Sequence, residues 1–164
     1  NGGSFGQNIS QAAGVAWARR WKKEKGLVWL FLSDGEFQEG QTWEALMSMA
    51  FHKISNIKIV VDVNGQQVDG RTSEVMNLEP FLKKVSSFGA CVKQVDGHNL
   101  SALNNAFETF HEDKPLVVLA KTSPYKGMDI LEGRYPFLHY VRFKDENERN
   151  DFKNYLKQME SRKL

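Results

Sequence analysis

Two polar side chains stand directly after apolar runs, at a spacing that suits a metal site. Asp34 follows the apolar run 27–32, and Asn64 ends a second apolar run that begins at residue 57. Carboxylate and amide oxygens are hard ligands that suit Mg²⁺ or Ca²⁺, and Mg²⁺ commonly keeps phosphate or water in its remaining positions. If the two runs are neighbouring strands, these side chains can hold a divalent cation together with a diphosphate.

The residues around this pair also suit a phosphate ligand. A backbone carbonyl near Gln66 supplies a third oxygen, and Gly35 lets phosphate oxygens approach the backbone closely. The free N–H groups of a helix beginning after Glu39 favour an anion. The glycine loop 3–7, ahead of the first helix, is a candidate second clamp. Each of these segments, taken alone, is more commonly an ordinary turn.

The order of apolar runs and helical patterns along the chain predicts the elements that position these residues. Continuous apolar runs are typical of strands buried on both faces of a parallel sheet. Their alternation with helices predicts an α/β fold, a three-layer α/β/α arrangement with helices on both faces of a parallel sheet. Ligands of such sheets collect at the carboxyl ends of the strands. Strands are expected over 27–32, 57–63, 90–95 and 116–120, and helices over 9–23, 40–53, 78–87 and 100–111.

We interpret the chain, residues 1–164, as a single domain that ends in a polar helix over 145–160. The irregular stretch 123–142 is long enough to indicate a functional loop. The net charge is +2, from 22 basic and 20 acidic residues, so charge gives no reason to expect a nucleic-acid or membrane partner. Cys91 is the single cysteine, which cannot form an internal disulfide, and a cytoplasmic location fits.

In combination, these segments resemble the thiamin-diphosphate-binding half of transketolases. The resemblance rests on Gly3-Ser4-Phe5-Gly6-Gln7, on Ser33-Asp34-Gly35-Glu36-Phe37-Gln38-Glu39-Gly40 with Trp43-Glu44-Ala45, and on 62–70, Asp96-Gly97-His98 and Lys121-Thr122. The ending, Leu138-His139-Tyr140 followed by one charged helix, is similar to the N-terminal subunit of split transketolases. The resemblance also implies that the chain is shortened at its N-terminus.

The resemblance assigns roles to individual residues. Asp34 and Asn64 would bind Mg²⁺ through their side chains, and Gln66 through its carbonyl. Gly35 and Asn64 would also contact the diphosphate. Gly3, Ser4 and Phe5 would line the cofactor. Glu39 and Glu44 would lie where two cofactor sites communicate across a subunit interface. His139 would lie above the thiazolium and contact cofactor or substrate.

The implied activity is the transfer of a two-carbon ketol unit between phosphorylated or free sugars. It requires a pyrimidine-binding partner, such as the C-terminal subunit of a split transketolase, in a homodimer or heterotetramer. Because no segment of this chain matches that partner domain, we expect the chain to be inactive alone.

Three positions depart from the family pattern: Ser33 and Asn8 replace usual glycines, and Pro124 replaces a lysine. His139 is one residue out of step with the usual spacing. Two alternatives therefore stay open. The chain could belong to another thiamin enzyme, of the 2-oxo acid dehydrogenase or 1-deoxyxylulose-phosphate synthase type, or be a non-catalytic cofactor-binding or assembly subunit.

Overall fold

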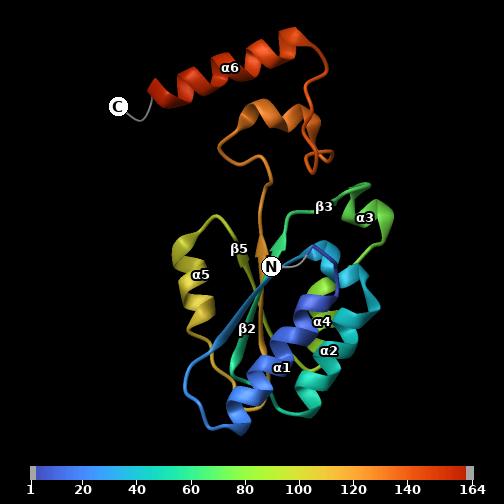
Figure 1. Cartoon of the computed structure of the whole chain (residues 1–164), viewed down its shortest axis with the longest axis vertical. Coiled ribbons are helices and arrows are strands. Elements are labelled where there is room, and N and C mark those ends of the chain that lie inside the picture. Colours follow the sequence, from blue (N-terminus) through green and yellow to red (C-terminus); the bar gives the residue numbers. More distant parts are fainter. Residues whose placement is uncertain (1–2, 162–164) are drawn as a thin grey trace.

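The structure, a computed structural model, describes residues 3–161, and these fold around a parallel sheet of four strands (Figure 1). The strands are β1 (Val28–Ser33), β2 (Ile57–Val63), β5 (Cys91–Asp96) and β6 (Leu116–Lys121). Their order in the sheet is β1-β2-β6-β5, so the last strand in the sequence lies in the interior. Because all four run in the same direction, their carboxyl ends share one edge.

Three helices cover one face of the sheet: α1 (Gln7–Trp21), α2 (Gly40–Phe51) and α4 (Phe81–Ser87) (Figure 1). Their apolar faces pack on alternate residues of the strands, because successive strand side chains point to opposite faces. This main core contains Ile9, Ala16, Leu46, Met49 and Val85 from the helices, against Ile57, Ile59, Val61, Val117 and Leu119 from the strands.

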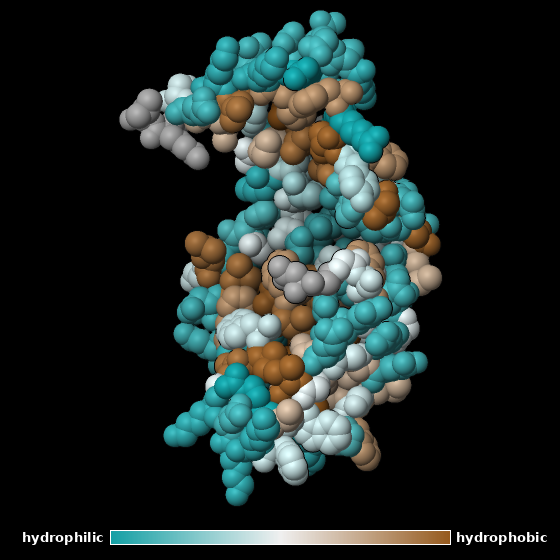
Figure 2. All heavy atoms as spheres, viewed as in Figure 1, coloured by the Kyte–Doolittle hydropathy of each residue, from teal (hydrophilic) through white to brown (hydrophobic). Residues whose placement is uncertain are grey.

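The opposite face is covered by α5 (Leu100–Phe107), whose Leu103, Ala106 and Phe107 pack near Leu116 and Val118 of β6. The α/β/α arrangement is thus confirmed, but α5 packs mainly on β5 and β6. Its last residue, Phe107, also lies edge-on to Trp29 of β1 and accepts a hydrogen bond from Lys58 of β2. The outer side of β1 stays open, with Trp29 53% and Phe31 72% exposed. The expectation that run 27–32 is buried on both faces is therefore wrong. Figure 2 shows apolar side chains gathered over the sheet beside α5.

The carboxyl edge of the sheet leads into short elements. β1 runs into a 3₁₀ helix, η1 (Asp34–Gln38), and β2 runs into a small hairpin of β3 (Gln66–Gln67) and β4 (Gly70–Arg71). A single helical turn, α3 (Thr72–Val75), follows the hairpin. These turns therefore bring the residues after β1 and β2 to the same edge.

An arm extends beyond this edge after β6, made of η2 (Asp129–Arg134) and α6 (Glu146–Ser161) (Figure 1). The guanidinium of Arg134 pairs with Glu148, donating from Nε to Oε1 at 3.1 Å, and so ties η2 to the first turn of α6. Figure 2 shows a hollow between this arm and the rest of the molecule. The predicted irregular stretch 123–142 contains one short helix, η2.

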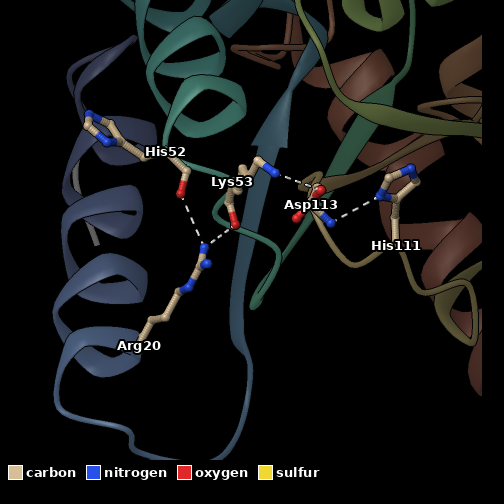
Figure 3. Close-up of polar contacts among 5 residues, drawn as sticks. All are labelled: Arg20, His52, Lys53, His111 and Asp113. Carbon is tan, nitrogen blue, oxygen red and sulfur yellow. Dashed lines mark hydrogen bonds and ion pairs between the residues drawn. The ribbon is translucent and has the colours of Figure 1, made fainter.

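The amino edge of the sheet carries a separate polar network (Figure 3). Arg20, near the end of α1, donates to the carbonyls of His52 and Lys53 just after α2. Lys53 pairs with Asp113 at 3.0 Å, and the ring of His111 accepts a hydrogen bond from the amide of Asp113. These histidines therefore lie at the edge opposite to Asp34 and take no part in its surroundings.

Several predicted bounds differ from the structure. The predicted helix over 78–87 begins only at Phe81, because Pro80 is in an extended conformation at its N-cap. The predicted helix over 100–111 ends at Phe107, while its Asn99 cap is confirmed by a 3.0 Å hydrogen bond from the amide of Ala102. None of the helices between residues 3 and 161 has the length and apolar character needed to cross a membrane.

Candidate cofactor and metal site

Asp34 is the first residue after β1, and its side chain is 2% exposed. One carboxylate oxygen, Oδ2, accepts hydrogen bonds from the amide of Gly65 at 3.0 Å and from the hydroxyl of Thr72 at 3.2 Å. The other oxygen, Oδ1, is buried and has no hydrogen-bond partner within residues 3–161. A buried acceptor without a partner is costly, so this oxygen is suited to a ligand.

The pKa of the Asp34 carboxyl is raised above its ordinary value because burial disfavours the charged form. The hydrogen bonds from Gly65 and Thr72 act in the opposite direction, and the nearby charge of Asp62 adds to the rise. A divalent cation at Oδ1 would favour the charged form and remove the unpaired acceptor. The electrostatics of the carboxyl therefore fit a metal ligand.

Asn64 lies just beyond β2 and is half-buried. Its Oδ1 accepts from the amide of Gln66 at 3.0 Å, and its Nδ2 donates to Oδ2 of Asp62 at 3.0 Å. The hydrogen bond from Gly65 to Asp34 brings this segment against the end of β1. The structure thus places the predicted ligands Asp34, Asn64 and Gln66 at one edge.

The side chain of Gln66 adds a second unpaired acceptor, because its Oε1 is buried without a partner in the described part of the chain. Among these residues, no group of three or more His, Cys, Asp or Glu could hold a metal ion. The site instead combines one carboxylate with amide and carbonyl oxygens. Such a set suits Mg²⁺ that arrives with phosphate oxygens, since Mg²⁺ then needs only one or two carboxylates.

The glycine loop at the start of the chain closes over this edge. A Cβ atom on Gly35 would lie 3.3 Å from Cε2 of Phe5, so a side chain there would push the ring of Phe5 away. The amide of Gly6 donates to Oε2 of Glu36 at 2.5 Å, and Glu36 is 6% exposed. Gly3 and Ser4 are exposed. Loop 3–7 is therefore fixed beside Asp34, as a second clamp requires.

Glu39 borders loop 3–7, because a Cβ atom on Gly6 would lie 3.0 Å from Cβ of Glu39. Glu39 is the exposed N-cap of α2, and Glu44, one turn further, lines a groove of about 480 Å³ between α1 and α2. His139 is exposed on the arm, with its ring centroid 4.6 Å from that of Tyr140. The structure brings together the predicted metal ligands with Gly35 and Phe5, whereas the roles of Glu39 and His139 stay predictions.

Sequence reasoning assigns no role to four residues of the site: Glu36, Asp62, Thr72 and Thr122. Each has a partner that is distant in the sequence, as Thr122 does by donating to Oδ1 of Asp62 at a separation of 60 residues. Asp62 and Thr122 both stand in segments that resemble transketolase, and this was the one available signal for them.

Residues 1–134 match the protein family described as "Transketolase, thiamine diphosphate binding domain". The chain belongs to this family. The matched range contains every residue of the edge cluster, from loop 3–7 to Thr122, and the predicted resemblance is confirmed. His139 and α6 lie outside it.

Relatives extend this result. A putative uncharacterized transketolase family protein of Sinorhizobium fredii is 38% identical over 136 residues, covering 81% of this chain and 49% of that protein. A 6-deoxy-6-sulfo-D-fructose transketolase subunit of a Clostridium species is 35% identical over 134 residues, covering 80% and 49%. An apulose-4-phosphate transketolase subunit of Actinobacillus succinogenes is 32% identical over 149 residues, covering 90% and 54%. The chain spans about half the length of these curated relatives.

Solved structures agree with the fold. The transketolase of Campylobacter jejuni superposes with a TM-score of 0.71 at 25% identity, covering 77% of this chain and 21% of that chain. The predicted thiamin-diphosphate-binding fold is therefore confirmed.

Proposed function

We propose that this chain is the metal- and diphosphate-binding half of a ketol transferase that uses thiamin diphosphate and Mg²⁺, or Ca²⁺ in its place. The observation that carries the proposal is the buried, unpaired Oδ1 of Asp34 beside Asn64, at the carboxyl edge of a transketolase-family sheet. In this proposal Asp34 and Asn64 bind the cation through side-chain oxygens and Gln66 binds it through its carbonyl.

Loop 3–7 and Gly35 enclose the diphosphate in this proposal. Phe5 already lies against Gly35, and the bond from Gly6 to Glu36 holds the loop in place, so the cofactor meets a prearranged wall. When bound, thiamin diphosphate supplies the carbon nucleophile that attacks a ketose carbonyl and accepts the electron pair released on cleavage. The chain's own contribution is to bind, orient and shield the diphosphate end.

Activity requires a second polypeptide or domain, because the chain spans about half the length of its relatives. We take this partner to be the pyrimidine-binding half, in a homodimer or heterotetramer that places Glu39 and Glu44 at the subunit interface and His139 near the substrate. Two relatives are named as transketolase subunits for a sugar derivative or a sugar phosphate, which supports that substrate class here. The location is cytoplasmic in this proposal.

Calorimetry on the complete protein, assembled with its pyrimidine-binding half, tests the proposal. Thiamin diphosphate should bind only with Mg²⁺ or Ca²⁺ present, and Asp34→Ala should abolish this binding, since it removes the charged ligand. Asp113→Ala, at the amino edge, is the matched control and should bind normally. Absence of binding to the unaltered complex would instead favour a non-catalytic role in assembly.

A donor screen separates the remaining alternatives. A ketose donor should transfer its two-carbon unit to an aldose acceptor with the complete complex, and this chain alone should show no transfer. Release of CO₂ from a 2-oxo acid, without ketol transfer, would point to another class of thiamin enzyme.

A further inference from the structure

Both carboxylate oxygens of Asp62 are engaged by neighbours that flank the metal site. Oδ2 accepts from Nδ2 of Asn64 at 3.0 Å, and Oδ1 accepts from the hydroxyl of Thr122 at 2.5 Å. Asp62 lies near the carboxyl end of β2, and Thr122 directly follows β6, its neighbour in the sheet. The Asp62 carboxylate therefore links the two strand ends through Asn64 and Thr122.

Two hydrogen bonds, one to Asp62 and one from the amide of Gln66, set which end of the Asn64 amide faces the site. An amide has an oxygen that accepts and a nitrogen that only donates, so an unrestrained Asn side chain can present either end. Asp62 can only pair with the nitrogen, and the oxygen then faces the amide of Gln66 at 3.0 Å. That oxygen keeps a second lone pair for a cation. A rotated amide would direct N–H groups at a cation instead.

Thr122 is itself held in one position. Its backbone amide donates to the carbonyl of Val63 at 3.1 Å, which fixes the residue against β2. Its methyl group touches Gly97 closely, because a Cβ atom on Gly97 would lie only 2.6 Å from Cγ2 of Thr122. The methyl group thus fills the space beside Gly97, while the hydroxyl of Thr122 donates to Asp62.

We propose that Asp62 and Thr122 are positioning residues, which orient Asn64 as a metal ligand through the chain Thr122–Asp62–Asn64. The inference rests on the proposed function, since it takes Asn64 to be a ligand of the cofactor's cation. Outer partners of this kind commonly change metal affinity by about 10- to 100-fold when removed. Mg²⁺ demands near-ideal octahedral geometry whereas Ca²⁺ tolerates varied geometry. Loosening Asn64 should therefore weaken Mg²⁺ binding more than Ca²⁺ binding.

Thr122→Val and Thr122→Ser form the matched pair that tests this inference. Valine keeps the methyl group but cannot donate to Asp62, and serine keeps the hydroxyl. The measurement is the Kd of Mg²⁺ and of Ca²⁺ at saturating thiamin diphosphate, by calorimetry on the complete, partnered protein. Thr122→Val should raise the Kd of Mg²⁺ about 10-fold and the Kd of Ca²⁺ clearly less. Thr122→Ser should bind both ions with the Kd values of the unaltered protein.

A second variant guards against a folding defect. Asp62→Leu keeps roughly the size of the side chain but cannot accept from Asn64 or from Thr122, so it should give the same preferential loss of Mg²⁺. Circular dichroism and the Tm of the metal-free variants show whether they fold. The inference is overturned if Thr122→Val loses affinity for both ions equally or loses none. It is also overturned if Thr122→Ser binds Mg²⁺ as weakly as Thr122→Val does.

The outcome for the unaltered protein separates this inference from the proposed function. If the unaltered complex binds the cofactor and Asp34→Ala does not, the proposed function stands, and unchanged binding by Thr122→Val and Asp62→Leu overturns the positioning role alone. If the unaltered complex binds no cofactor with either ion, the proposed function and the inference are both overturned.

Discussion

The buried carboxyl of Asp34 lowers the folding stability of the metal-free protein at neutral pH, and this makes the stability depend on pH. Burial raises its pKa above the ordinary value of 3.8, so the folded state binds this proton more tightly than the unfolded state does. Stability from this group is therefore fully present below about pH 4 and is lost as the pH rises through the higher folded pKa. At neutral pH the charged Asp34 lowers the stability of the metal-free protein.

Asp34→Asn should therefore be at least as stable as the unaltered metal-free protein at pH 7, although the proposed function expects it to lose cofactor binding. Asparagine can still accept the hydrogen bonds from Gly65 and Thr72 with its one oxygen. The difference in Tm between variant and unaltered protein should shrink as the pH falls toward 4. Thermal unfolding followed by circular dichroism between pH 4 and 8 measures this, and a variant that is least stable at pH 7 would contradict it.

At this scale the sequence identified residues next to apolar runs and missed those brought in by folding. Asp34 and Asn64 were predictable because parallel strands end at one edge. Glu36 gave no comparable signal, since a glutamate after a strand is usually exposed, and its burial depends on the distant amide of Gly6. Thr122 meets Asp62 only because β6 lies beside β2.

The arm at the carboxyl edge depends on few contacts between its two helices. The pair with Arg134 lowers the pKa of Glu148 below its ordinary value, and the amide of Lys144 adds to this effect. The contribution of this pair is present above pH 4.5 and is lost as the pH falls through the lowered pKa of Glu148. The amide of Glu148 also donates to Asp145 at 2.8 Å, which caps the start of α6.

Arg134→Met should loosen α6 from η2 and leave the sheet intact. Limited proteolysis within residues 135–145 should become several-fold faster, while the Tm changes little, because the arm packs outside the main core. Arg149→Met is the matched control, since Arg149 forms only an exposed pair with Glu146 within α6. Equal proteolysis rates for the two variants would show that Arg134 does not hold the arm.

Helix positions were predictable from local patterns, but which strand faces they cover was not. A run such as 27–32 has the same composition whether one or both of its faces are covered. For β1 the deciding fact is that α5 packs mainly over β5 and β6 and meets β1 only where Phe107 contacts Trp29, which is a tertiary property of the described residues. The arm shows the same limit, since the Arg134–Glu148 pair leaves no local signal in the sequence.

Across the whole molecule, the two faces of the sheet differ in cover. On β1 the side chain of Leu32 is 2% exposed beneath the helices, while its neighbour Phe31 is 72% exposed on the other side. Large exposed apolar side chains on one face favour self-association and dye binding. The two residues therefore offer a direct comparison of the covered and the open face.

Phe31→Thr should change the free energy of unfolding of this chain by less than about 0.5 kcal/mol, as an exposed substitution does. It should also lower the fluorescence of an apolar dye such as 1-anilinonaphthalene-8-sulfonate. Leu32→Ala, the matched control, should cost about 2–5 kcal/mol because it leaves a cavity in the core. Urea unfolding measures both, and similar costs for the two variants would contradict the difference between the faces.

The interior place of β6 has a consequence for the order in which the chain is made. β1 and β2 can pair once residue 63 has left the ribosome, but β5 has no neighbour until Leu116–Lys121 has been synthesised. Since a domain generally folds as a unit, the sheet is completed only after β6 has been synthesised and enters between β2 and β5. The hydroxyl of Thr122 can reach Asp62 only after that step, so the proposed chain of hydrogen bonds to Asn64 is the last to be completed.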